Sequence, residues 1–342
     1  MSTDCEGTMA ANQPALQGAA SAPVGGALLL RSALIKTGKF WLLFAAVVLL
    51  GFSRTNADPL FHALVLAVAF TAIYVSFGSG ARMWAFYLAG FIFFAQLRSY
   101  ADETGLPVQF DYPIVMEEVL FLGQIPTIWL QDRFYTFAEA GFLEVYTMTV
   151  YLSYFFLPHV LAFCLWKWDR PRFNHYVLAF VITLWIGLLV SVLLPTAPPW
   201  LAGQEGYIDP VYQVVPDVLG GGESGTYERG YTAAGANDVA AMPSLHSAIP
   251  FVMMFALWKY RGLKWAGVWF AASMPFAVVY LGEHYFVDAL AGLVAAGAGW
   301  LTAQWTLEWW RGRAETRISE RGGAAATVND SSDSHLPSET AG

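Results

Sequence analysis

The stretch HYVLAFVITLWIGLLVSVLL, residues 175–194, decides the fold class, because its 20 residues include no Asp, Glu, Lys or Arg. An α-helix needs about 20 apolar residues to cross a bilayer. Similar stretches recur along the chain, some of them shorter. The sequence therefore predicts an all-α fold, a polytopic membrane helix bundle of about eight transmembrane helices (six to eight), at residues 37–53, 60–77, 82–97, 143–165, 175–194, 244–258, 264–282 and 284–305.

The composition agrees with a membrane protein, since 56% of the residues are hydrophobic and only 13% are charged. Residues 1–30 are small and polar, and residues 312–342 are rich in Ser, Ala, Gly and charge. Both segments lack apolar periodicity and are predicted to be disordered tails. Residues 31–311 between them form the predicted transmembrane domain. The two cysteines, Cys5 and Cys164, offer no disulfide framework.

The basic residues predict the orientation of the bundle. If the N-terminus is cytoplasmic, the outer segments hold only Arg54, Arg98, Arg133 and Arg229. The inner segments then hold 14 of the 18 basic residues: Arg31, Lys36, Lys39, Arg82, Lys167, Arg170, Arg172, Lys259, Arg261, Lys264, Arg311, Arg313, Arg317 and Arg321. The positive-inside rule therefore predicts two cytoplasmic termini and two long outer loops, at about 98–142 and 195–243. The membrane and the net charge of −8 exclude nucleic acid as a partner.

Two polar clusters stand where apolar segments begin, at the outer end of the predicted bundle. The first is Tyr280-Leu-Gly-Glu-His-Tyr-Phe-Val-Asp288, in which His284 and Asp288 are one helical turn apart, so that the carboxylate can accept a hydrogen bond from one ring nitrogen. The second is Met242-Pro-Ser-Leu-His-Ser247, with Ser244 as the expected N-cap of a helix. Each cluster alone is compatible with a structural role. Together they indicate function, as ionisable groups at membrane depth generally do.

The chemistry of these clusters suits phosphoryl transfer. Free backbone N–H groups at the helix start after Ser244 can bind a phosphate. His284, oriented by Asp288, can attack phosphorus while His246 protonates the leaving oxygen. A zinc site with His246, His284 and Asp288 as ligands is the alternative for the same residues. The sequence contains no nucleotide loop, cysteine pair or acidic metal cluster, so no cofactor is implied.

The two clusters resemble the second and third signatures of the type 2 phosphatidic acid phosphatase superfamily. Within it, the chain is most similar to the branch of inositol phosphorylceramide synthases, which share Pro-Ser-Leu-His-Ser, His-Tyr-Phe-Val-Asp and an upstream Ala-Pro-Pro-Trp, here Ala197–Trp200. The resemblance covers residues 190–300. It implies a phosphohistidine intermediate, with His284 as nucleophile, Asp288 as its orienting acid, His246 as acid and base, and Ser244 and Ser247 at the phosphate.

The chain also departs from the superfamily pattern. Val278 stands where the third signature usually has an arginine, and Lys167-Trp-Asp-Arg-Pro171 has the wrong spacing and the wrong side of the membrane for the first signature. A phosphodiester, with one negative charge, tolerates this loss of cations better than a phosphomonoester does. Arg98, at the end of an apolar span, and Arg229, in a Gly-rich loop, are the candidate phosphate contacts. Trp200 is expected to form an interfacial corner.

These inferences predict a membrane phosphotransferase whose partners are a phospholipid donor, such as phosphatidylinositol, and a hydroxyl acceptor. With water as acceptor the same residues would form a lipid phosphate phosphatase. A transporter with a histidine proton relay is a third reading, which the clustering of these groups at one mouth disfavours. Short segments that begin near Tyr112 and Ile125 are expected to form a membrane-surface helix over the site. The sequence does not identify the acceptor or the oligomeric state.

Overall fold

The computed structural model describes residues 82–98, 105–137, 141–219 and 237–333. The first two predicted spans, 37–53 and 60–77, lie outside these ranges. Within the described ranges every regular element is a helix, and the extended segments make only isolated bridges. The all-α class is thereby confirmed.

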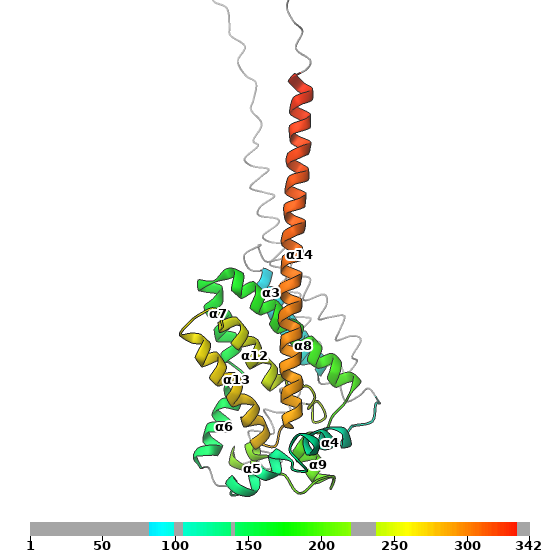
Figure 1. Cartoon of the computed structure of the whole chain (residues 1–342), viewed down its shortest axis with the longest axis vertical. Coiled ribbons are helices and arrows are strands. Elements are labelled where there is room, and N and C mark those ends of the chain that lie inside the picture. Colours follow the sequence, from blue (N-terminus) through cyan, green and yellow to red (C-terminus); the bar gives the residue numbers. More distant parts are fainter. Residues whose placement is uncertain (1–81, 99–104, 138–140, 220–236, 334–342) are drawn as a thin grey trace, which may run out of the picture.

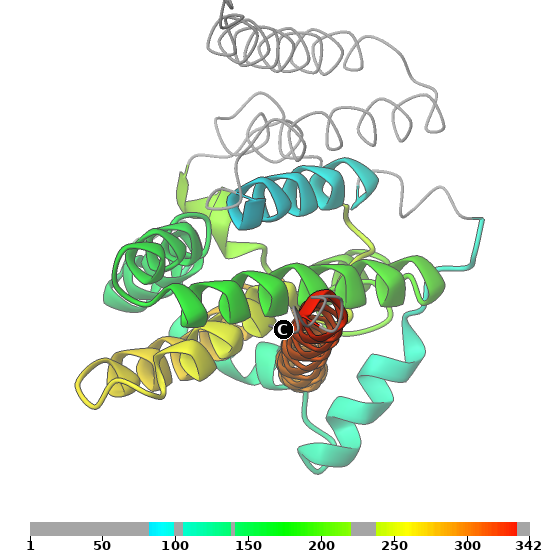
Figure 2. The ribbon, with the colours of Figure 1, turned by 90° about the horizontal axis from the view of Figure 1, so that it is seen from above.

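The long helices run side by side to form a bundle (Figure 1). It consists of α3 (Arg82–Arg98), α6 (Phe142–Ser153), α7 (Leu157–Trp168), α8 (Arg170–Leu193), α12 (Leu245–Leu257), α13 (Leu263–Tyr280) and α14 (Phe286–Asp333). Helix α8 packs against α3 on one side and α14 on the other, and α12 packs against α8, α13 and α14 (Figure 2). The start of α12 and the start of α14 are therefore neighbours inside the bundle.

Two of the described helices have the length and apolarity to cross a membrane, and a third span is present if one bent pair of helices is counted as a single span. The two are helix α8 and the segment Phe286–Arg317 of α14. The predicted span 143–165 is instead two helices, α6 and α7, bent by 49°. The bend lies just before Pro158. Proline has no backbone N–H group and therefore cannot make the hydrogen bond that a residue in a helix interior makes. Helices α3 and α12 are shorter apolar helices, and the total of eight spans stays a prediction.

Helix α14 continues to Asp333, into the segment predicted to be a disordered tail. This part of the chain has Ala, Glu and Arg among its residues, which have high helix propensity. The prediction of a disordered tail was based on the lack of apolar periodicity and did not take this helix propensity into account.

Four short helices gather at the lower end of the bundle: α4 (Asp111–Leu120), α5 (Pro126–Phe134), α9 (Pro199–Gln204) and α10 (Val214–Leu219). The figure shows α4, α5 and α9 there (Figure 1). Gln131 of α5 ties them to the bundle, because its amide nitrogen donates to the carbonyls of Tyr212 and Tyr280, both at 2.9 Å. One side of α4 is apolar and exposed, notably Val119 and the following Leu122. The structure thus has short helices at both predicted positions, two of them rather than one.

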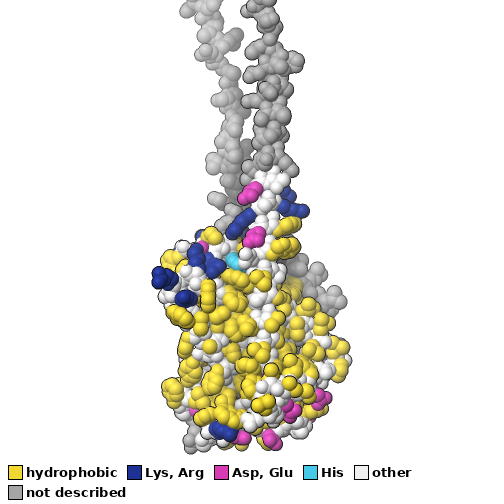
Figure 3. Space-filling view, viewed as in Figure 1, with side chains coloured by type: hydrophobic (Ala, Val, Ile, Leu, Met, Phe, Trp, Pro, Cys, Tyr) yellow, Lys and Arg dark blue, Asp and Glu magenta, His cyan; other side chains and the backbone are white. Residues whose placement is uncertain are grey.

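Charged side chains lie at the ends of the bundle, and hydrophobic side chains cover its flank (Figure 3). Most of the Lys and Arg side chains seen in this view gather at the upper end. The adjoining ends of α7 and α8 and of α12 and α13 supply basic residues, including Lys167, Arg170, Lys259 and Lys264. The short helices at the lower end supply acidic residues, including Asp111, Glu118 and Asp132, and one basic residue, Arg133. An enrichment of Lys and Arg at one end of a helix bundle is the asymmetry that the positive-inside rule describes.

Candidate active site

The two polar clusters meet where α12 and α14 begin. The backbone N–H of Ser244 donates to the carbonyl of Asp288 at 2.9 Å. Gly292 of α14 makes this approach possible, because a Cβ there would lie 2.5 Å from the Ser244 carbonyl oxygen. Ser244 caps α12 as expected, its hydroxyl accepting from the N–H of Ser247 at 3.3 Å.

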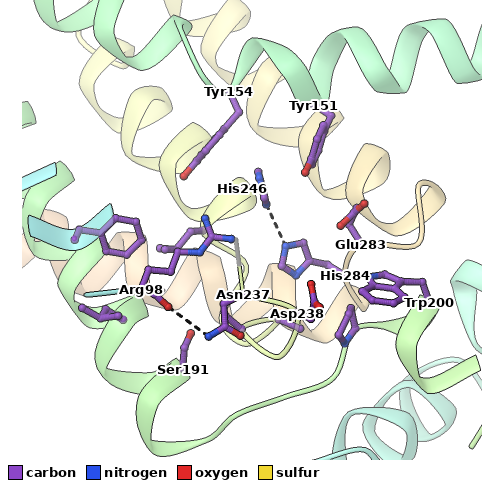
Figure 4. A pocket seen from close by; sticks show the side chains of 16 residues that line it. Arg98, Tyr151, Tyr154, Ser191, Trp200, Asn237, Asp238, His246, Glu283 and His284 are labelled. Carbon is purple, nitrogen blue, oxygen red and sulfur yellow. Dashed lines mark hydrogen bonds between the residues drawn. The ribbon is translucent and has the colours of Figure 1, made fainter. Parts of the chain in front are cut away.

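Three ionisable side chains lie next to one another at this junction, and Figure 4 shows two of them, His246 and His284. Nδ1 of His246 lies 3.2 Å from Nε2 of His284. Nδ1 of His284 lies 3.5 Å from Oδ2 of Asp288. Asp288 is fully buried and His284 is 6% exposed. Because Asp288 faces Nδ1, the Nε2 atom of His284 is the one directed at His246 and at the cavity.

The predicted hydrogen bond between His284 and Asp288 needs correction in two respects. His284 precedes α14, which begins at Phe286, so the pair does not share a helix face. The 3.5 Å separation is an ion-pair distance, and Asp288 instead accepts the N–H of Tyr285 at 2.8 Å. The carboxylate therefore lies beside the imidazole and also caps the start of the helix.

Aromatic rings enclose His246. The ring centroids of Tyr151 and Tyr154 lie 4.8 Å and 4.6 Å from that of the imidazole. Tyr151 lies in the last turn of α6, and Tyr154 is the C-cap residue that follows this helix, next to the bend. Both tyrosines line the cavity (Figure 4). The sequence analysis missed them, although two tyrosines three residues apart before a proline are a usable signal for a helix end that faces inward.

Arg98 is the predicted cation that the structure brings to the site. It is the last residue of α3, and its side chain lines the cavity with both histidines (Figure 4). The side chain of Asn237 donates to the Arg98 carbonyl at 3.3 Å and holds this helix end. Arg133, by contrast, stacks on Trp129 at 4.2 Å. Arg229 and Arg54 lie outside the described residues.

Comparison with known proteins identifies the family to which the chain belongs. A family profile described as the PAP2 superfamily matches residues 120–302, more than half of the chain. This chain belongs to the PAP2 superfamily. The match includes α12, the turn after α13 and the start of α14, and so it includes both histidines and Asp288.

Two curated relatives are similar over a smaller part of the chain. "Phosphoinositol dihydroceramide synthase" of Bacteroides thetaiotaomicron is 29% identical over 179 residues, 48% of this chain and 56% of the relative. "Inositol phosphorylceramide synthase" of Candida albicans is 28% identical over 160 residues, 44% of this chain and 34% of the relative. The chain thus spans about half and about one third of the length of these relatives. No solved structure matches it.

Several other residues that the sequence analysis singled out do not line the cavity. Ser244 and Ser247 are fully buried, and neither side chain reaches the cavity wall. Val278 is buried within α13. The turn Lys167–Pro171 lies at the other end of the bundle, as predicted, where Asp169 pairs with Lys259 at 2.7 Å. Among the described residues, no group of three or more His, Cys, Asp or Glu side chains is arranged to hold a metal ion.

Trp200, which was expected to form an interfacial corner, lines the cavity with its side chain (Figure 4). Its backbone N–H donates to the carbonyl of Gly282 at 3.2 Å. Two carboxylates that the sequence analysis passed over, Asp238 and Glu283, line the cavity as well. Glu283 directly precedes His284 in the sequence, and that adjacency was an available signal.

Glu117 of α4 is a further residue that sequence reasoning missed. Its side chain is fully buried, one oxygen accepts the N–H of Val287 at 2.8 Å, and the other has no hydrogen-bond partner among the described residues. This contact joins α4 to the first turn of α14, beside Asp288. Burial, with a smaller contribution from the nearby charge of Asp288, raises the pKa of Glu117 to about 7 from its ordinary value of 4.5.

We expect this carboxyl group to make the stability of the protein pH-dependent. Because its pKa is higher in the folded state, its stabilising contribution is present below pH 4.5 and is lost as the pH rises through about 7. Glu117→Gln keeps an acceptor for Val287 and should flatten this dependence, measured as the thermal unfolding midpoint in detergent. Glu118→Gln is the control, since Glu118 is the exposed neighbour. Equal pH profiles for wild type and Glu117→Gln would contradict the assignment.

Proposed function

We propose that this protein is an integral-membrane phosphotransferase that moves a phosphoryl head group, such as phosphoinositol, from a phospholipid to a lipid or other hydroxyl acceptor. The observation that carries the proposal is the adjacency of His246, His284 and Asp288, with Arg98 at the same cavity. The names of the two relatives, a phosphoinositol dihydroceramide synthase and an inositol phosphorylceramide synthase, support the same head group and a ceramide-like acceptor.

The proposed reaction is a double displacement. Phosphate entry replaces the contact between the two imidazoles, and Nε2 of His284 attacks phosphorus. The bond from phosphorus to the diacylglycerol oxygen breaks, and His246 gives that oxygen a proton. In the second step His246 removes the proton of the acceptor hydroxyl, whose oxygen attacks phosphorus and releases His284. Covalent catalysis divides one difficult displacement into two easier ones.

Hydrolysis is the second candidate, with water in place of the acceptor hydroxyl. The cavity favours a phosphodiester over a phosphomonoester, because Arg98 is its single basic residue other than the histidines within the described part of the chain. Each charge-assisted hydrogen bond to a phosphate contributes roughly 1.5–3 kcal/mol, and a dianion depends on more of them. A monoester phosphatase therefore fits this site less well than a transferase.

A lipid-transfer assay tests the proposal. The purified protein would be given phosphatidylinositol labelled in its head group, with ceramide as acceptor. We expect a labelled inositol-phosphate lipid and an equal amount of diacylglycerol. Water-soluble inositol phosphate would indicate hydrolysis, and release of inorganic phosphate from phosphatidic acid alone would indicate a phosphatase. Either of these results without lipid product would overturn the transferase.

We place the site on the extracytoplasmic face, since the basic end of the bundle is the opposite one. Cysteines introduced singly at Glu205 and Gly262, both exposed, should then label from opposite sides of the membrane with an impermeant maleimide, Glu205→Cys from outside. The background would lack Cys5 and Cys164. Labelling of Gly262→Cys from outside would reverse the orientation, and labelling of both from one side would refute the separation of the two ends.

Arg98 should act as the phosphate contact. Arg98→Ala is expected to lose roughly 2–4 kcal/mol of transition-state stabilisation, the effect of removing one preorganised donor. Arg98→Lys should recover only part, because an ammonium cannot reproduce the guanidinium fork. The measurement is kcat/KM with the labelled donor. Arg133→Ala is the matched control at the same end of the bundle, and Arg229→Ala is expected to do less than Arg98→Ala. If Arg98→Ala is nearly silent while Arg229→Ala is damaging, the loop supplies the contact.

A further inference from the structure

A second cavity, of about 190 Å³, lies at the opposite end of the bundle from the two catalytic histidines. It is formed by the start of α8, the turn after α12 and the middle of α14. The Lys, Arg, Asp and Glu residues that line it are Asp169, Arg172, Lys259, Glu308 and Arg311. Three cations therefore face two carboxylates in a cavity that takes no part in the proposed reaction.

The guanidinium of Arg172 is held in place in the wall of this cavity. Its Nε donates to the carbonyl of Ala256 at 3.0 Å and its Nη2 to the carbonyl of Phe255 at 3.2 Å, both in the last turn of α12. Its central carbon lies 5.0 Å from the ring centroid of Trp300 in α14. A guanidinium has five N–H donors, so Arg172 can donate to a ligand while it keeps both carbonyls.

Asp169 does not neutralise this guanidinium, because its carboxylate is bonded to other groups. One oxygen accepts from the ammonium of Lys259 at 2.7 Å and from the hydroxyl of Tyr260 at 2.8 Å. The other accepts the backbone N–H of Arg172 at 3.1 Å. The charge of Asp169 is thus matched by Lys259, and the guanidinium of Arg172 is left to interact with neutral carbonyls.

Glu308, the other carboxylate, is an exposed helix residue that accepts from Nε2 of Gln304 at 3.0 Å. Within the described ranges of the chain, no carboxylate forms an ion pair with Arg172 or with Arg311. The cavity therefore has an excess of positive charge at two guanidinium groups. A guanidinium is well suited to a phosphate, because its fork can donate two parallel hydrogen bonds to two phosphate oxygens.

Exposed tryptophans place this cavity at the level of a membrane surface. They are Trp258, directly after α12, and Trp305, Trp309 and Trp310 of α14. Tryptophan is enriched where the lipid head groups meet the hydrocarbon. Phospholipid phosphates lie at this depth, and basic pockets between membrane helices are typical binding sites for anionic lipid head groups.

We propose that this cavity binds the phosphate of an anionic phospholipid, with Arg172 and Arg311 as its contacts. The acyl chains then lie along exposed apolar residues of α14 such as Leu301. A zwitterionic lipid such as phosphatidylcholine carries a cation beside its phosphate, and so it matches the excess positive charge less well. Because Arg172 comes from α8 and Arg311 from α14, a shared phosphate should tie these two helices together and stabilise the bundle.

Native mass spectrometry of the full-length protein in detergent measures this binding, with phosphatidylglycerol and phosphatidylcholine as probes. We expect phosphatidylglycerol to bind more tightly. Arg311→Gln, at an exposed position that should not disturb folding, is expected to weaken it by roughly fivefold or more, the contribution of one cation at a membrane surface. Arg313→Gln is the matched control, since Arg313 lies on the same helix, stacks on Trp309 at 4.1 Å and does not line the cavity.

Glu308→Gln should have the opposite effect, because it removes a negative charge from the wall and should strengthen the binding of phosphatidylglycerol. The thermal unfolding midpoint should rise with added phosphatidylglycerol in the wild type and rise less in Arg311→Gln.

Glycerol phosphate presents a phosphate without acyl chains. If it raises the midpoint as much as phosphatidylglycerol does, the ligand is a soluble phosphate and the lipid site is overturned. Equal binding of the two lipids, or equal losses in Arg311→Gln and Arg313→Gln, would overturn it as well. Neither measurement uses turnover, so failure of the proposed head-group transfer would leave this site standing.

Discussion

Replacing His284 by alanine should abolish head-group transfer. The imidazole is held with Nδ1 toward Asp288 and Nε2 toward His246, and no other described nucleophile occupies that position. Loss of a catalytic nucleophile removes the covalent pathway, with an expected fall in kcat of more than roughly 10⁴-fold. The assay is transfer of labelled phosphoinositol to ceramide by purified protein at equal folded concentration.

A histidine elsewhere in the bundle provides the matched control. His175 of α8 stacks on Trp300 with ring centroids 3.9 Å apart, and it lines the separate pocket at the other end of the bundle. His175→Ala should reduce stability and leave turnover per folded molecule close to wild type. The adduct on histidine is expected to be acid-labile. Label from the phospholipid should therefore survive on alkali-treated wild-type protein better than on acid-denatured wild-type protein, and it should be absent from His284→Ala. Retained turnover in purified His284→Ala would refute the mechanism.

The sequence was sufficient for the features that depend on local pattern. Apolar runs predicted the helical class and the positions of α3, α8, α12 and α13 to within a few residues, because long apolar runs are typical of helices buried in a membrane or in the core of a bundle. The N-cap at Ser244 was also readable, because a serine before an apolar helix satisfies its free N–H groups. The spacing of His284 and Asp288 identified two residues that the structure does bring together.

The contacts that complete the site were not readable, because they join segments far apart in the chain. Glu117 reaches Val287 across 170 positions, and Tyr151 and Tyr154 contact His246 across 95 and 92 positions. Periodicity reports which face of a helix is apolar and does not report which helices become neighbours. The sequence interpretation was wrong at one point. It placed His284 and Asp288 on a single helix, because it took no account of Gly282, which lies between α13 and His284.

Gly282 explains why His284 stands outside the helix. Its φ of +81° belongs to the left-handed region that favours glycine, and a Cβ there would lie 2.5 Å from the carbonyl oxygen of Tyr212. This turn ends α13 and lets the chain re-enter the bundle at Phe286. His284 is thereby carried on a tight turn, and Asp288 on the first turn of the following helix approaches it from one side.

Asp288→Asn should leave a folded protein whose turnover is lower by roughly 10²–10⁴-fold, the size of effect that accompanies loss of tautomer control of a catalytic histidine. Asparagine keeps an oxygen for the N–H of Tyr285 and hence the helix cap. It lacks the charge that favours a proton on Nδ1 of His284 and stabilises the imidazolium formed during attack. The loss should therefore appear in kcat, with KM for the phospholipid little changed.

Asp169→Asn separates orientation of the histidine from helix capping. Asp169 caps α8 at the opposite end of the bundle, where its side chain accepts the N–H of Arg172 at 3.1 Å. The same substitution there removes a charge at a helix start, and should lower the thermal unfolding midpoint without changing kcat per folded molecule. If Asp288→Asn behaves like Asp169→Asn, with stability reduced and kcat retained, then Asp288 serves only as a cap, and His284 must be oriented by the turn at Gly282 alone.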